Sequence, residues 1–466
     1  MSTLVSEWSA LPPAYSVVLY EGRPPRRANK PLRVKLGDHV RIEADHVHRY
    51  CFSAGSALQE DVAAVLSAVR TADRAGPRLH GSGWARSLAM EVPVYDRTLW
   101  QSPRVSSALV DALQYLTGDN WTVDFRSRQG QPATSAQPHL LAPPDQKRAF
   151  LPYSSGLDSF ALASLIQRES PDTELILVNV QAAHNLTDWK NLGRTREKDL
   201  NAVKVAYHFK EPHRSEPTFR TRPLIYDMLA CQGAAMAQPA SVLIPENGQG
   251  SLGGSLVPLG QEAPHRSCHP GFTSRLSKLV EALTGVAVPI EHPALFKTKG
   301  QVLTQLAAQN PATETWLAGH RSCSYDARHS SRGKRSMHCG VCGNCILRRV
   351  ATQWAELKDS TEYEADDLTA SSFGASFTEG APRTMAAKRD VALNSIRAMQ
   401  RLADLTENPR SIRVVTEVAS LSRSLGEPIE EVREKMEKFL HQHKTEWVQF
   451  LEVCGPSSWV TDLARN

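Results

Sequence analysis

The pattern of apolar and polar residues predicts alternating strands and helices near the start of the chain. Short runs rich in β-branched and apolar residues are the predicted strands: 16–20, 39–44, 88–95 and 121–125. Pro93 would place the third of these at a sheet edge, because proline has no N–H for an inner ladder. Apolar residues at helical spacing predict helices over 60–72 and 105–116. We therefore expect an α+β domain over residues 1–128.

The pattern changes after a stretch rich in Gln, Pro and Ser, which predicts a linker over 129–147. Predicted strands and helices then follow one another, with strands at 149–153, 174–180 and 241–244, and helices at 158–168, 194–207 and 223–237. Such alternation is typical of a parallel sheet with helices on both faces. We expect an α/β domain over 148–355, a polar linker over 356–384 and a helical extension over 385–466.

Composition narrows the class of protein without changing this picture. The 466 residues are 41% hydrophobic and 22% charged, which is typical of a globular chain with two or three domains. No apolar run reaches the roughly 20 residues of a membrane helix, and the start of the chain lacks the pattern of a secretory signal. These features predict a cytoplasmic protein with no membrane partner.

The net charge of +5 is too small to indicate nucleic-acid binding by itself. Basic residues are concentrated within 321–350, where seven of them accompany Asp326 as the single acidic residue. Such a patch suits phosphates or an acidic partner, and a solvated loop is an equal alternative. Nucleic acid therefore stays open as a partner without being strongly indicated.

The turn between the strand at 149–153 and the next helix has features of a phosphate site. Ser154, Ser155 and Gly156 are small, which lets the backbone approach a ligand closely. The free N–H groups of the helix start favour an anion. Ser159 adds a hydroxyl, and Asp158 would cap the helix or position Mg²⁺. An ordinary capped turn is the alternative, but the βαβ context favours a ligand site.

A glycine-rich stretch follows the predicted strand at 241–244 and contains Glu246, Asn247 and Gly248. One carboxylate among flexible residues at the end of a strand suits substrate recognition. A flexible surface loop is the alternative interpretation.

Four of the eight cysteines lie within one short segment: Cys323, Cys339, Cys342 and Cys345. Tetrahedral Zn²⁺ takes four thiolates, and Cys-x2-Cys spacing lets one turn supply two of them. We predict a closed, structural zinc site in a reducing compartment, with a redox dithiol or an iron–sulfur site as alternatives. Neighbouring histidines are competing ligands: His320, His329 and His338.

Both motifs resemble one known family. Residues 154–159 resemble the Ser-Gly-Gly-x-Asp-Ser loop of the PP-loop ATP pyrophosphatases, with Ser155 where glycine is usual. Cys323 and the Cys-Gly-Val-Cys-Gly-Asn-Cys run at 339–345 are similar to the zinc-binding sequence of the 7-cyano-7-deazaguanine synthases (QueC) of that superfamily. Segments 219–225 and 296–299 are similar to two further family segments. The resemblance covers about 148–352.

The resemblance implies an ATP-dependent carbon–nitrogen ligase that splits ATP between its α and β phosphates, with ATP, Mg²⁺ and Zn²⁺ as cofactors. The implied catalytic residues are Ser154, Asp158, Ser159 and Lys299. The implied ATP contacts are Ser154, Ser155, Gly156, Leu157, Asp158, Ser159, Val178, Asn179 and Arg222. The implied substrate contacts are Glu246, Asn247 and Gly248.

The implied substrate is a deazaguanine-type acid, 7-carboxy-7-deazaguanine, which is adenylated and then aminated to an amide or nitrile. QueC-like proteins with extra domains occur in anti-phage defence, and the added regions resemble that group. This implies a specialised relative that joins the acid to the amine of a partner macromolecule. Two alternatives stay open: a tRNA-thiolating enzyme in which Cys231 or Cys268 relays sulfur, and a degenerate nucleotide-binding scaffold.

Overall fold

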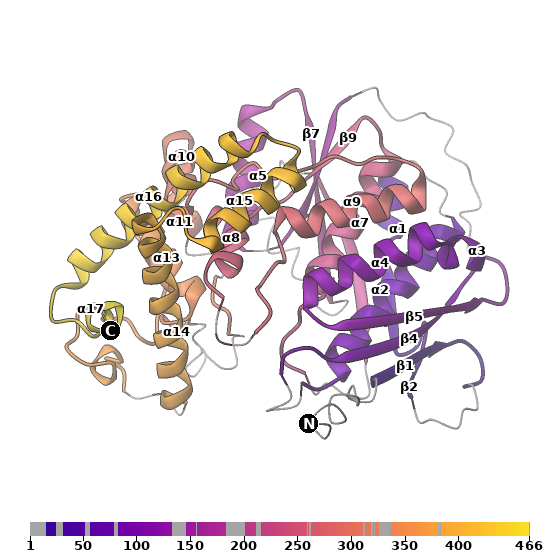
Figure 1. Ribbon diagram of the computed structural model, residues 1–466, viewed down its shortest axis with the longest axis horizontal. Helices are drawn as coiled ribbons and strands as arrows, with labels where there is room; N and C mark the ends of the chain where they lie inside the picture. The colour runs from indigo at the N-terminus through magenta and orange to yellow at the C-terminus, as the bar shows by residue number, and fades with distance from the viewer. Residues whose placement is uncertain are drawn as a thin grey trace, which may run out of the picture. The chain divides into compact units, whose positions relative to one another are not determined.

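The computed structural model divides into two compact units that interleave along the chain (Figure 1). One unit comprises Met1–Tyr153, Pro171–Ile244 and Gln261–Glu291, and the other comprises Ser154–Ser170, Pro245–Gly260 and His292–Asn466. The structure describes residues 15–24, 31–51, 56–78, 83–132, 146–154, 156–182, 201–210, 216–258, 260, 262–310, 313–317, 320, 322–325, 335, 337–380, 382 and 384–465. Among these, no helix combines the length and apolar character that crossing a membrane requires.

A parallel sheet of four strands forms one part of the first unit, in the order β2-β1-β4-β5. Its strands are β1 (Tyr15–Tyr20), β2 (Leu32–Lys35), β4 (Ser87–Val94) and β5 (Asn120–Ser127). Helix α2 (Ala57–Ala75) packs on β1 and β4, and α4 (Pro103–Thr117) packs on β5. The expectation of an edge position for the strand with Pro93 is wrong. Strand β1 pairs only with the first half of β4, so Pro93 lies beyond that ladder.

A second sheet has six strands in the order β10-β9-β6-β7-β8-β3, all parallel except the antiparallel pair of β8 and β3. Its strands are β3 (Val40–Glu43), β6 (Arg148–Tyr153), β7 (Glu174–Ala182), β8 (Asn201–Phe209), β9 (Ala240–Leu243) and β10 (Ile290–Glu291). Every residue of β6 is buried, as is typical of an inner parallel strand. The expected mixed α/β class is confirmed.

The predicted helix at 194–207 is wrong where the structure describes it, because β8 occupies this part of the chain. Apolar residues recur in β8 at a period of two, which fits a strand better than a helix: Val203, Val205, Tyr207 and Phe209. Residues 194–200 lie outside the described residues.

Helix α7 (Arg222–Met236) packs on β6, β7 and β9 and begins beside a buried ionic network. Asp73 of α2 accepts hydrogen bonds from the N–H and hydroxyl of Thr221, both at 2.9 Å, and pairs with Arg86 at 2.7 Å. This network fixes the helix start that carries Arg222. The other helices of the unit are α1 (Asp45–Tyr50), α3 (Arg97–Gln101) and α9 (Pro270–Thr284).

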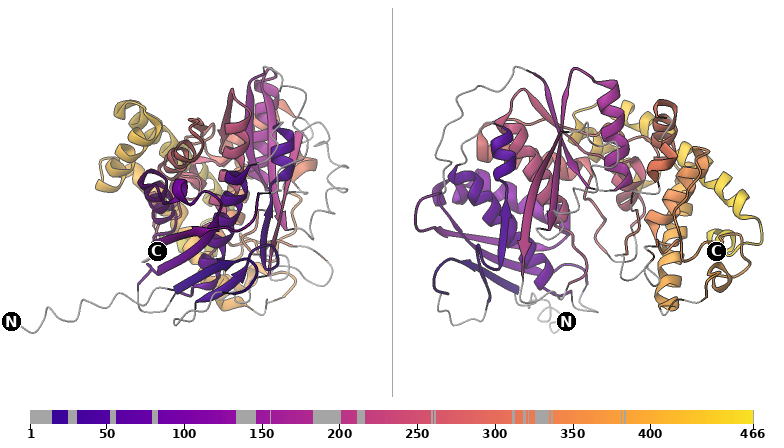
Figure 2. Two further views of the ribbon diagram at one scale, coloured as in Figure 1. Left: turned by 90° about the vertical axis from the view of Figure 1, so that its right-hand side faces the viewer. Right: turned by 180° about the vertical axis from the view of Figure 1, so that it is seen from behind.

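The second unit is helical, and Figure 2 draws its last helices in orange and yellow. Its helices are α5 (Leu157–Glu169), α8 (Gly248–Leu256), α10 (Lys299–Gln309), α11 (Thr313–Leu317), α13 (Gly343–Trp354), η3 (Gly374–Ser376), α14 (Met385–Asp404), η4 (Leu405–Glu407), α15 (Ile412–Leu425), α16 (Ile429–Cys454) and α17 (Trp459–Arg465). The long helix α16 packs against α13, α14 and α15. The irregular segment before α14 buries Tyr363, Ala365, Leu368 and Phe377 in the same core as the cysteines.

Candidate functional site

The loop after β6 keeps the start of α5 open to a ligand. The helix N-cap is Gly156, which has no side chain to accept hydrogen bonds from the first turn. Ser154 and Ser159 hold the loop together: the Ser159 hydroxyl donates to the Ser154 carbonyl at 2.6 Å, and the Gly156 N–H donates to Ser154 Oγ at 3.2 Å. Ser155, a predicted ATP contact, lies outside the described residues. The arrangement suits an anion at the helix N-terminus.

Asp158, in the first turn of α5, is the centre of a polar cluster. Lys299 Nζ lies 2.8 Å from Asp158 Oδ2, and Asn247 Nδ2 donates to Asp158 Oδ1 at 2.8 Å. Asn247 Nδ2 is also 2.9 Å from Glu246 Oε1. Three segments that are distant in sequence therefore bring together four of the predicted site residues. Only 4% of the Lys299 side chain is exposed, against 26% of Asp158, so the pair opens on the carboxylate side.

Local sequence explains how these side chains are placed. Asn247 is the N-cap of α8, and its Oδ1 accepts from the Gly250 N–H at 3.2 Å. A Cβ at position 250 would lie 2.3 Å from Glu246 Oε1, so glycine is needed there for the carboxylate to lie over the helix start. Thr298 and Gln301 form a capping box that begins α10 at Lys299.

Glu246 has an unusual acidity in this cluster. Desolvation, followed by the neighbouring Asp158 carboxylate, raises the pKa of Glu246 to about 8, against the partial opposing effect of Lys299. The carboxyl is thus protonated over much of the neutral range and can donate as well as accept a hydrogen bond. Groups with such shifts are common at sites that handle protons or charged ligands.

Three of the remaining predicted ATP contacts, Val178, Asn179 and Arg222, belong to the first unit, and Leu157 belongs to the second. Asn179 is buried near the end of β7, where its Nδ2 donates to the Tyr153 carbonyl at 3.3 Å and its Oδ1 has no partner within the described structure. The side chain of Val178 is fully buried in the core, which leaves only its backbone for a ligand. Leu157 of the second unit is also buried, so its contribution would be the N–H group.

Arg222 lines a cavity of about 300 Å³ in the first unit. Two arginines of α2 line it as well, and the Arg70 guanidinium lies 4.1 Å from the ring centroid of Phe209 and 4.4 Å from that of Phe219. The described lining residues include three arginines and no carboxylate. Positive charge among aromatic rings makes this pocket suitable for an aromatic anion. Sequence reasoning found Arg222 but missed the contribution of α2.

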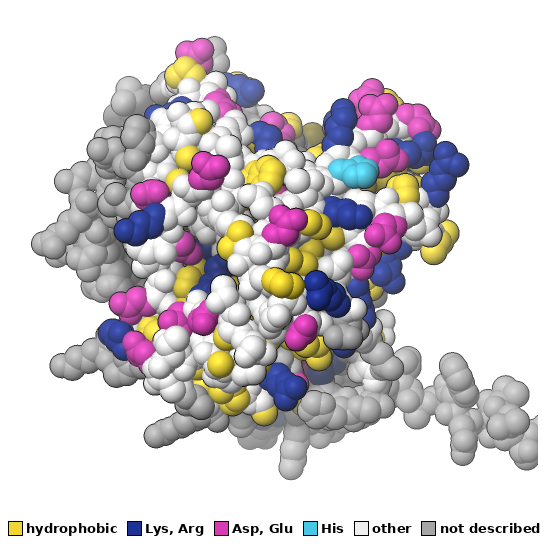
Figure 3. Space-filling view, turned by 90° about the vertical axis from the view of Figure 1, so that its left-hand side faces the viewer, with side chains coloured by type: hydrophobic (Ala, Val, Ile, Leu, Met, Phe, Trp, Pro, Cys, Tyr) yellow, Lys and Arg dark blue, Asp and Glu magenta, His cyan; other side chains and the backbone are white. Residues whose placement is uncertain are grey.

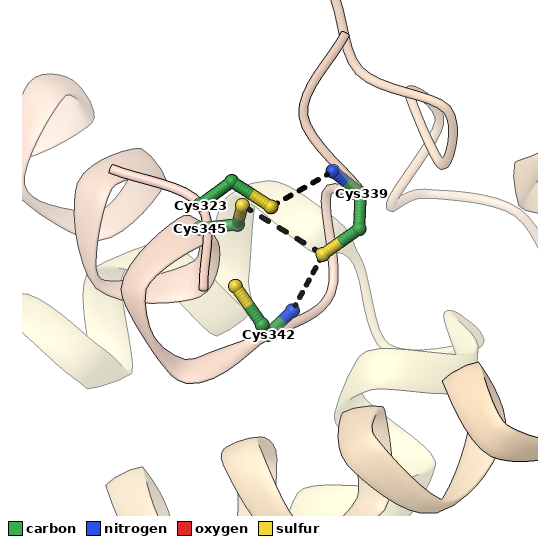
Figure 4. Close-up of side chains that lie close together, drawn as sticks. All are labelled: Cys323, Cys339, Cys342 and Cys345. Carbon is green, nitrogen blue, oxygen red and sulfur yellow. Dashed lines mark hydrogen bonds between the residues drawn. The ribbon is translucent and has the colours of Figure 1, made fainter. Parts of the chain in front are cut away.

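The four cysteines converge as predicted (Figure 4). Their sulfur atoms all lie within 4.8 Å of one another, and those of Cys339 and Cys345 are 3.9 Å apart. A tetrahedral zinc site with Zn–S bonds of about 2.3 Å places its sulfurs about 3.8 Å apart, so the cluster fits this metal.

The competing histidines are engaged elsewhere in the described structure. The ring of His320 stacks on Phe160 of α5 with centroids 4.8 Å apart, and His338 packs edge-on against Tyr363. His329 lies outside the described residues. Backbone N–H groups of Ser324, Cys339 and Cys342 point at the cysteine sulfurs instead, at 3.3 to 3.4 Å. The four sulfur atoms therefore form the candidate ligand set, and N–H groups of their own loop donate hydrogen bonds to them.

The predicted basic patch is corrected for its described members. Arg348 is fully buried, donates to the His320 carbonyl at 2.6 Å and pairs with Asp359 at 3.2 Å. Arg349 donates to the Ala365 carbonyl at 2.8 Å, so both arginines support the fold. On the face of the molecule that Figure 3 displays, Lys and Arg side chains are interspersed with Asp and Glu. The other predicted members, except Arg335, lie outside the described residues.

The two thiols considered for sulfur relay differ in burial. Cys231 is fully buried in α7, and burial raises the pKa of its thiol well above the usual range, which disfavours the nucleophilic thiolate. Cys268 is half-buried. The geometry of the first unit thus gives no support to a thiolation mechanism through Cys231.

No protein-family model matches the chain. A 7-cyano-7-deazaguanine synthase of Paracoccus denitrificans is 25% identical over 236 residues, which are 46% of this chain and 92% of that protein. Another, of Rhizobium rhizogenes, is 35% identical over 104 residues, which are 22% of this chain and 39% of that protein. A third, of Rhizobium meliloti, is 26% identical over 231 residues, or 48% and 88% of the two chains.

Fold and site together define a mixed α/β protein with a parallel sheet and a candidate zinc centre of four cysteines. The relatives described above share one name, 7-cyano-7-deazaguanine synthase. The chain is a relative of the 7-cyano-7-deazaguanine synthases. Each of the matches described above leaves more than half of this chain unmatched.

Proposed function

We propose that this chain uses ATP to adenylate the carboxylate of a 7-deazaguanine-type acid, 7-carboxy-7-deazaguanine, and then transfers the acyl group to an amine. The observation that carries the proposal is the cluster at the start of α5, where Lys299 and Asn247 hold Asp158 beside an uncapped helix N-terminus. An anionic phosphate chain suits this place because helix N–H groups and a lysine attract it. The relatives named as 7-cyano-7-deazaguanine synthases support the choice of acid.

The chemistry needs two transfers. A carboxylate oxygen attacks the α-phosphorus of ATP, the bond to the β-phosphate oxygen breaks, and pyrophosphate leaves. The amine then attacks the acyl carbon, AMP leaves with the bonding electrons, and the amine loses a proton. Preorganised donors stabilise the charge that develops on pyrophosphate, which is the role we give to Ser154, Ser159 and the N–H groups of α5. Lys299 adds a fixed positive charge.

Metal ions have separate roles in this proposal. Asp158 would supply an oxygen atom of the kind that Mg²⁺ prefers, and Glu246 would supply another once it loses its proton; bound Mg²⁺ would offset phosphate charge. The cysteine cluster would hold Zn²⁺ as a closed structural site. The arginine-lined pocket of the first unit suits an aromatic anion, a class that includes both ATP and the deazaguanine acid.

Pyrophosphate exchange tests the first transfer without knowledge of the amine. We expect labelled pyrophosphate to enter ATP only when 7-carboxy-7-deazaguanine and Mg²⁺ are both present, and guanine should not replace the acid. Addition of ammonium or a partner protein should then give AMP and an amide detected by mass spectrometry. Tight ATP binding with neither exchange nor AMP would overturn the proposal and favour the scaffold alternative. Release of ADP would also contradict it.

The residues beyond the matched region motivate a finer proposal. We propose a specialised cytoplasmic relative that acts in antiviral defence and attaches the acid to an amine of a protein partner. An intact-mass increase on that partner, dependent on ATP and the acid, is the expected result. A phage challenge with wild-type and Asp158→Asn chains tests the biological role, since equal protection by both would contradict it.

A further inference from the structure

Helix α16 presents one face to the two helix starts that carry the polar cluster. Phe439, His443 and Glu446 are spaced four and three residues apart, so they lie on the same side of the helix. All three are buried. Their contacts reach the starts of α8 and α10 in turn, along the axis of α16.

The first contact is made by the aromatic ring of Phe439. A Cβ at Gly248 would lie 2.5 Å from the Phe439 ring, so the first residue of α8 rests directly on this side chain. Gly248 also donates its N–H to the Lys297 carbonyl at 2.8 Å, which ties the start of α8 to the segment before α10. A shift of α16 would therefore displace the start of α8 and with it Asn247, the N-cap of this helix.

The second contact runs through Gln249 to the backbone of Lys299. Gln249 Oε1 accepts from the Lys299 N–H at 2.9 Å, and Gln249 Nε2 lies 3.5 Å from His443 Nδ1. His443 Nε2 is 2.9 Å from the Met399 carbonyl, which can only accept. The ring therefore carries its proton on Nε2, leaving Nδ1 to accept from Gln249. This places the Gln249 oxygen, rather than its nitrogen, toward Lys299.

The third contact is made by the carboxyl of Glu446. Its Oε1 accepts from the Thr298 hydroxyl and from Gln442 Nε2, the latter at 3.0 Å. A Cβ at Gly300 would lie 2.7 Å from the Glu446 carboxyl atoms, so this group touches both neighbours of Lys299, the Thr298 side chain and the Gly300 backbone. Glu446 Oε2 is buried without a partner in the described structure. Such a group is costly to bury unless it serves another purpose.

We propose that His443 and Glu446 of α16 are positioning residues that set the first turn of α10 and thereby the place of Lys299. The expected effect on catalysis rests on the proposed function, whereas the expected effect on the place of Lys299 does not. The helical extension is then part of the active centre instead of an independent appendage. A displacement of about 1 Å at a catalytic group typically costs about 100-fold in rate.

Substitutions that keep volume test the proposal without emptying the core. Glu446→Leu removes the acceptor of the Thr298 hydroxyl, and His443→Phe removes the acceptor of Gln249. We expect each to lower the maximal rate of pyrophosphate exchange by about 10- to 100-fold, with the ATP KM changed by less than about threefold. Glu446→Gln keeps an acceptor oxygen and should stay within about twofold of wild type.

Two controls separate positioning from general stability. Leu440→Ala creates a cavity in the same helix and should lower Tm while leaving the exchange rate nearly unchanged, because Leu440 packs in the core with α15. Val448→Ala alters an exposed residue of α16 and should change neither quantity. Activity losses that simply follow Tm across all variants would overturn the inference.

Hydrogen exchange gives a readout that does not depend on catalysis. The N–H groups of Lys299 and Gln301 are held by Gln249 and Thr298, so a peptide covering 297–303 is expected to be protected in wild type. Glu446→Leu and His443→Phe should speed exchange in this peptide by at least about tenfold, and Glu446→Gln should not. Unchanged protection in both variants would refute the inference, even if wild type shows no exchange of pyrophosphate. If wild type is inactive but the two variants still lose protection, only the proposed function is rejected.

Discussion

The cysteine cluster and the polar cluster around Asp158 are built in opposite ways. The four cysteines come from 23 residues, and their sulfurs take hydrogen bonds from their own loop. Asp158, Asn247 and Lys299 come from three distant segments, and the helix start beside them keeps its N–H groups uncapped by a side chain. A closed set of identical ligands suits structural support, whereas an open set with mixed charge suits a ligand that comes and goes.

The largest test of this contrast removes the metal ligands. Cys342→Ser, or treatment with a strong chelator, should remove zinc and lower the Tm of the second unit by at least about 10 °C. The reason is that structural zinc contributes about 10 kcal/mol or more to folding in small metal-bound domains. Thermal melts combined with elemental analysis for zinc provide the measurement.

Cys268→Ser is the matched control, because this half-buried thiol belongs to the other unit. It should leave the zinc content at one ion per chain. A Cys342→Ser chain that keeps both its zinc and its melting temperature would mean that the cluster is not the metal centre.

A smaller effect on stability, but a large one on activity, is expected at the open cluster. Lys299→Met removes the charge 2.8 Å from Asp158, and we expect pyrophosphate exchange to fall by about 100- to 1000-fold, or about 3–4 kcal/mol of transition-state stabilisation. Asp158 keeps its hydrogen bond from Asn247, so the circular dichroism spectrum should be unchanged. Initial exchange rates at saturating ATP are the measurement.

Lys297→Met is the control two residues away, where the exposed side chain bonds only to Gln305 among the described contacts. Its exchange rate should stay close to that of wild type. Equal rates for both variants would remove Lys299 from the catalytic group.

The smallest expected effect is a pH dependence of stability that arises from Glu446, which contacts the start of α10. Burial raises the pKa of Glu446 from 4.5 to about 7, so between these values the folded chain keeps a proton that the unfolded chain releases. Stability therefore falls as pH rises through this window, by up to about 3 kcal/mol, and this contribution is constant above it. Glu446→Gln should remove that part of the slope. Urea unfolding at pH 5, 6, 7 and 8 measures it, and identical slopes for both chains would contradict the assignment.

The two clusters also differ in how far sequence could predict them. The cysteines could be predicted because four ligands of one kind share a short segment, and the loop at Ser154 because small residues precede a helix start. The contact of Asp158 with Lys299 could not be derived from local pattern, and Lys299 was found only through a family resemblance. Glu446 was missed altogether. Glu446 lies between Leu440 and Trp447 in the sequence, and the structure buries all three. Its partner Thr298, the N-cap of α10, is brought to it only by tertiary packing.

The same distinction holds in the fold. Helices with strong periodicity and buried strands such as β6 follow from sequence, whereas β8 was mistaken because its period of two runs through residues that also suit a helix. Pro93 suggested an edge strand, yet β4 lies inside the sheet. Strand β1 pairs only with residues 88–91 of β4, so Pro93 needs no hydrogen bond to it. The domain ranges expected from sequence stay predictions, while the compact units interleave along the chain.

Interleaving has a consequence for how the protein is made. The segment with α5 leaves the ribosome long before α16, although both contribute to the second unit. A nascent or prematurely terminated chain can carry the loop at Ser154 and the cysteines, yet it lacks the helix that contacts the first turn of α10. Assembly of the proposed active centre is therefore postponed until α16 has been translated. Products that end before α16 should accordingly be inactive, with no partial enzymatic activity.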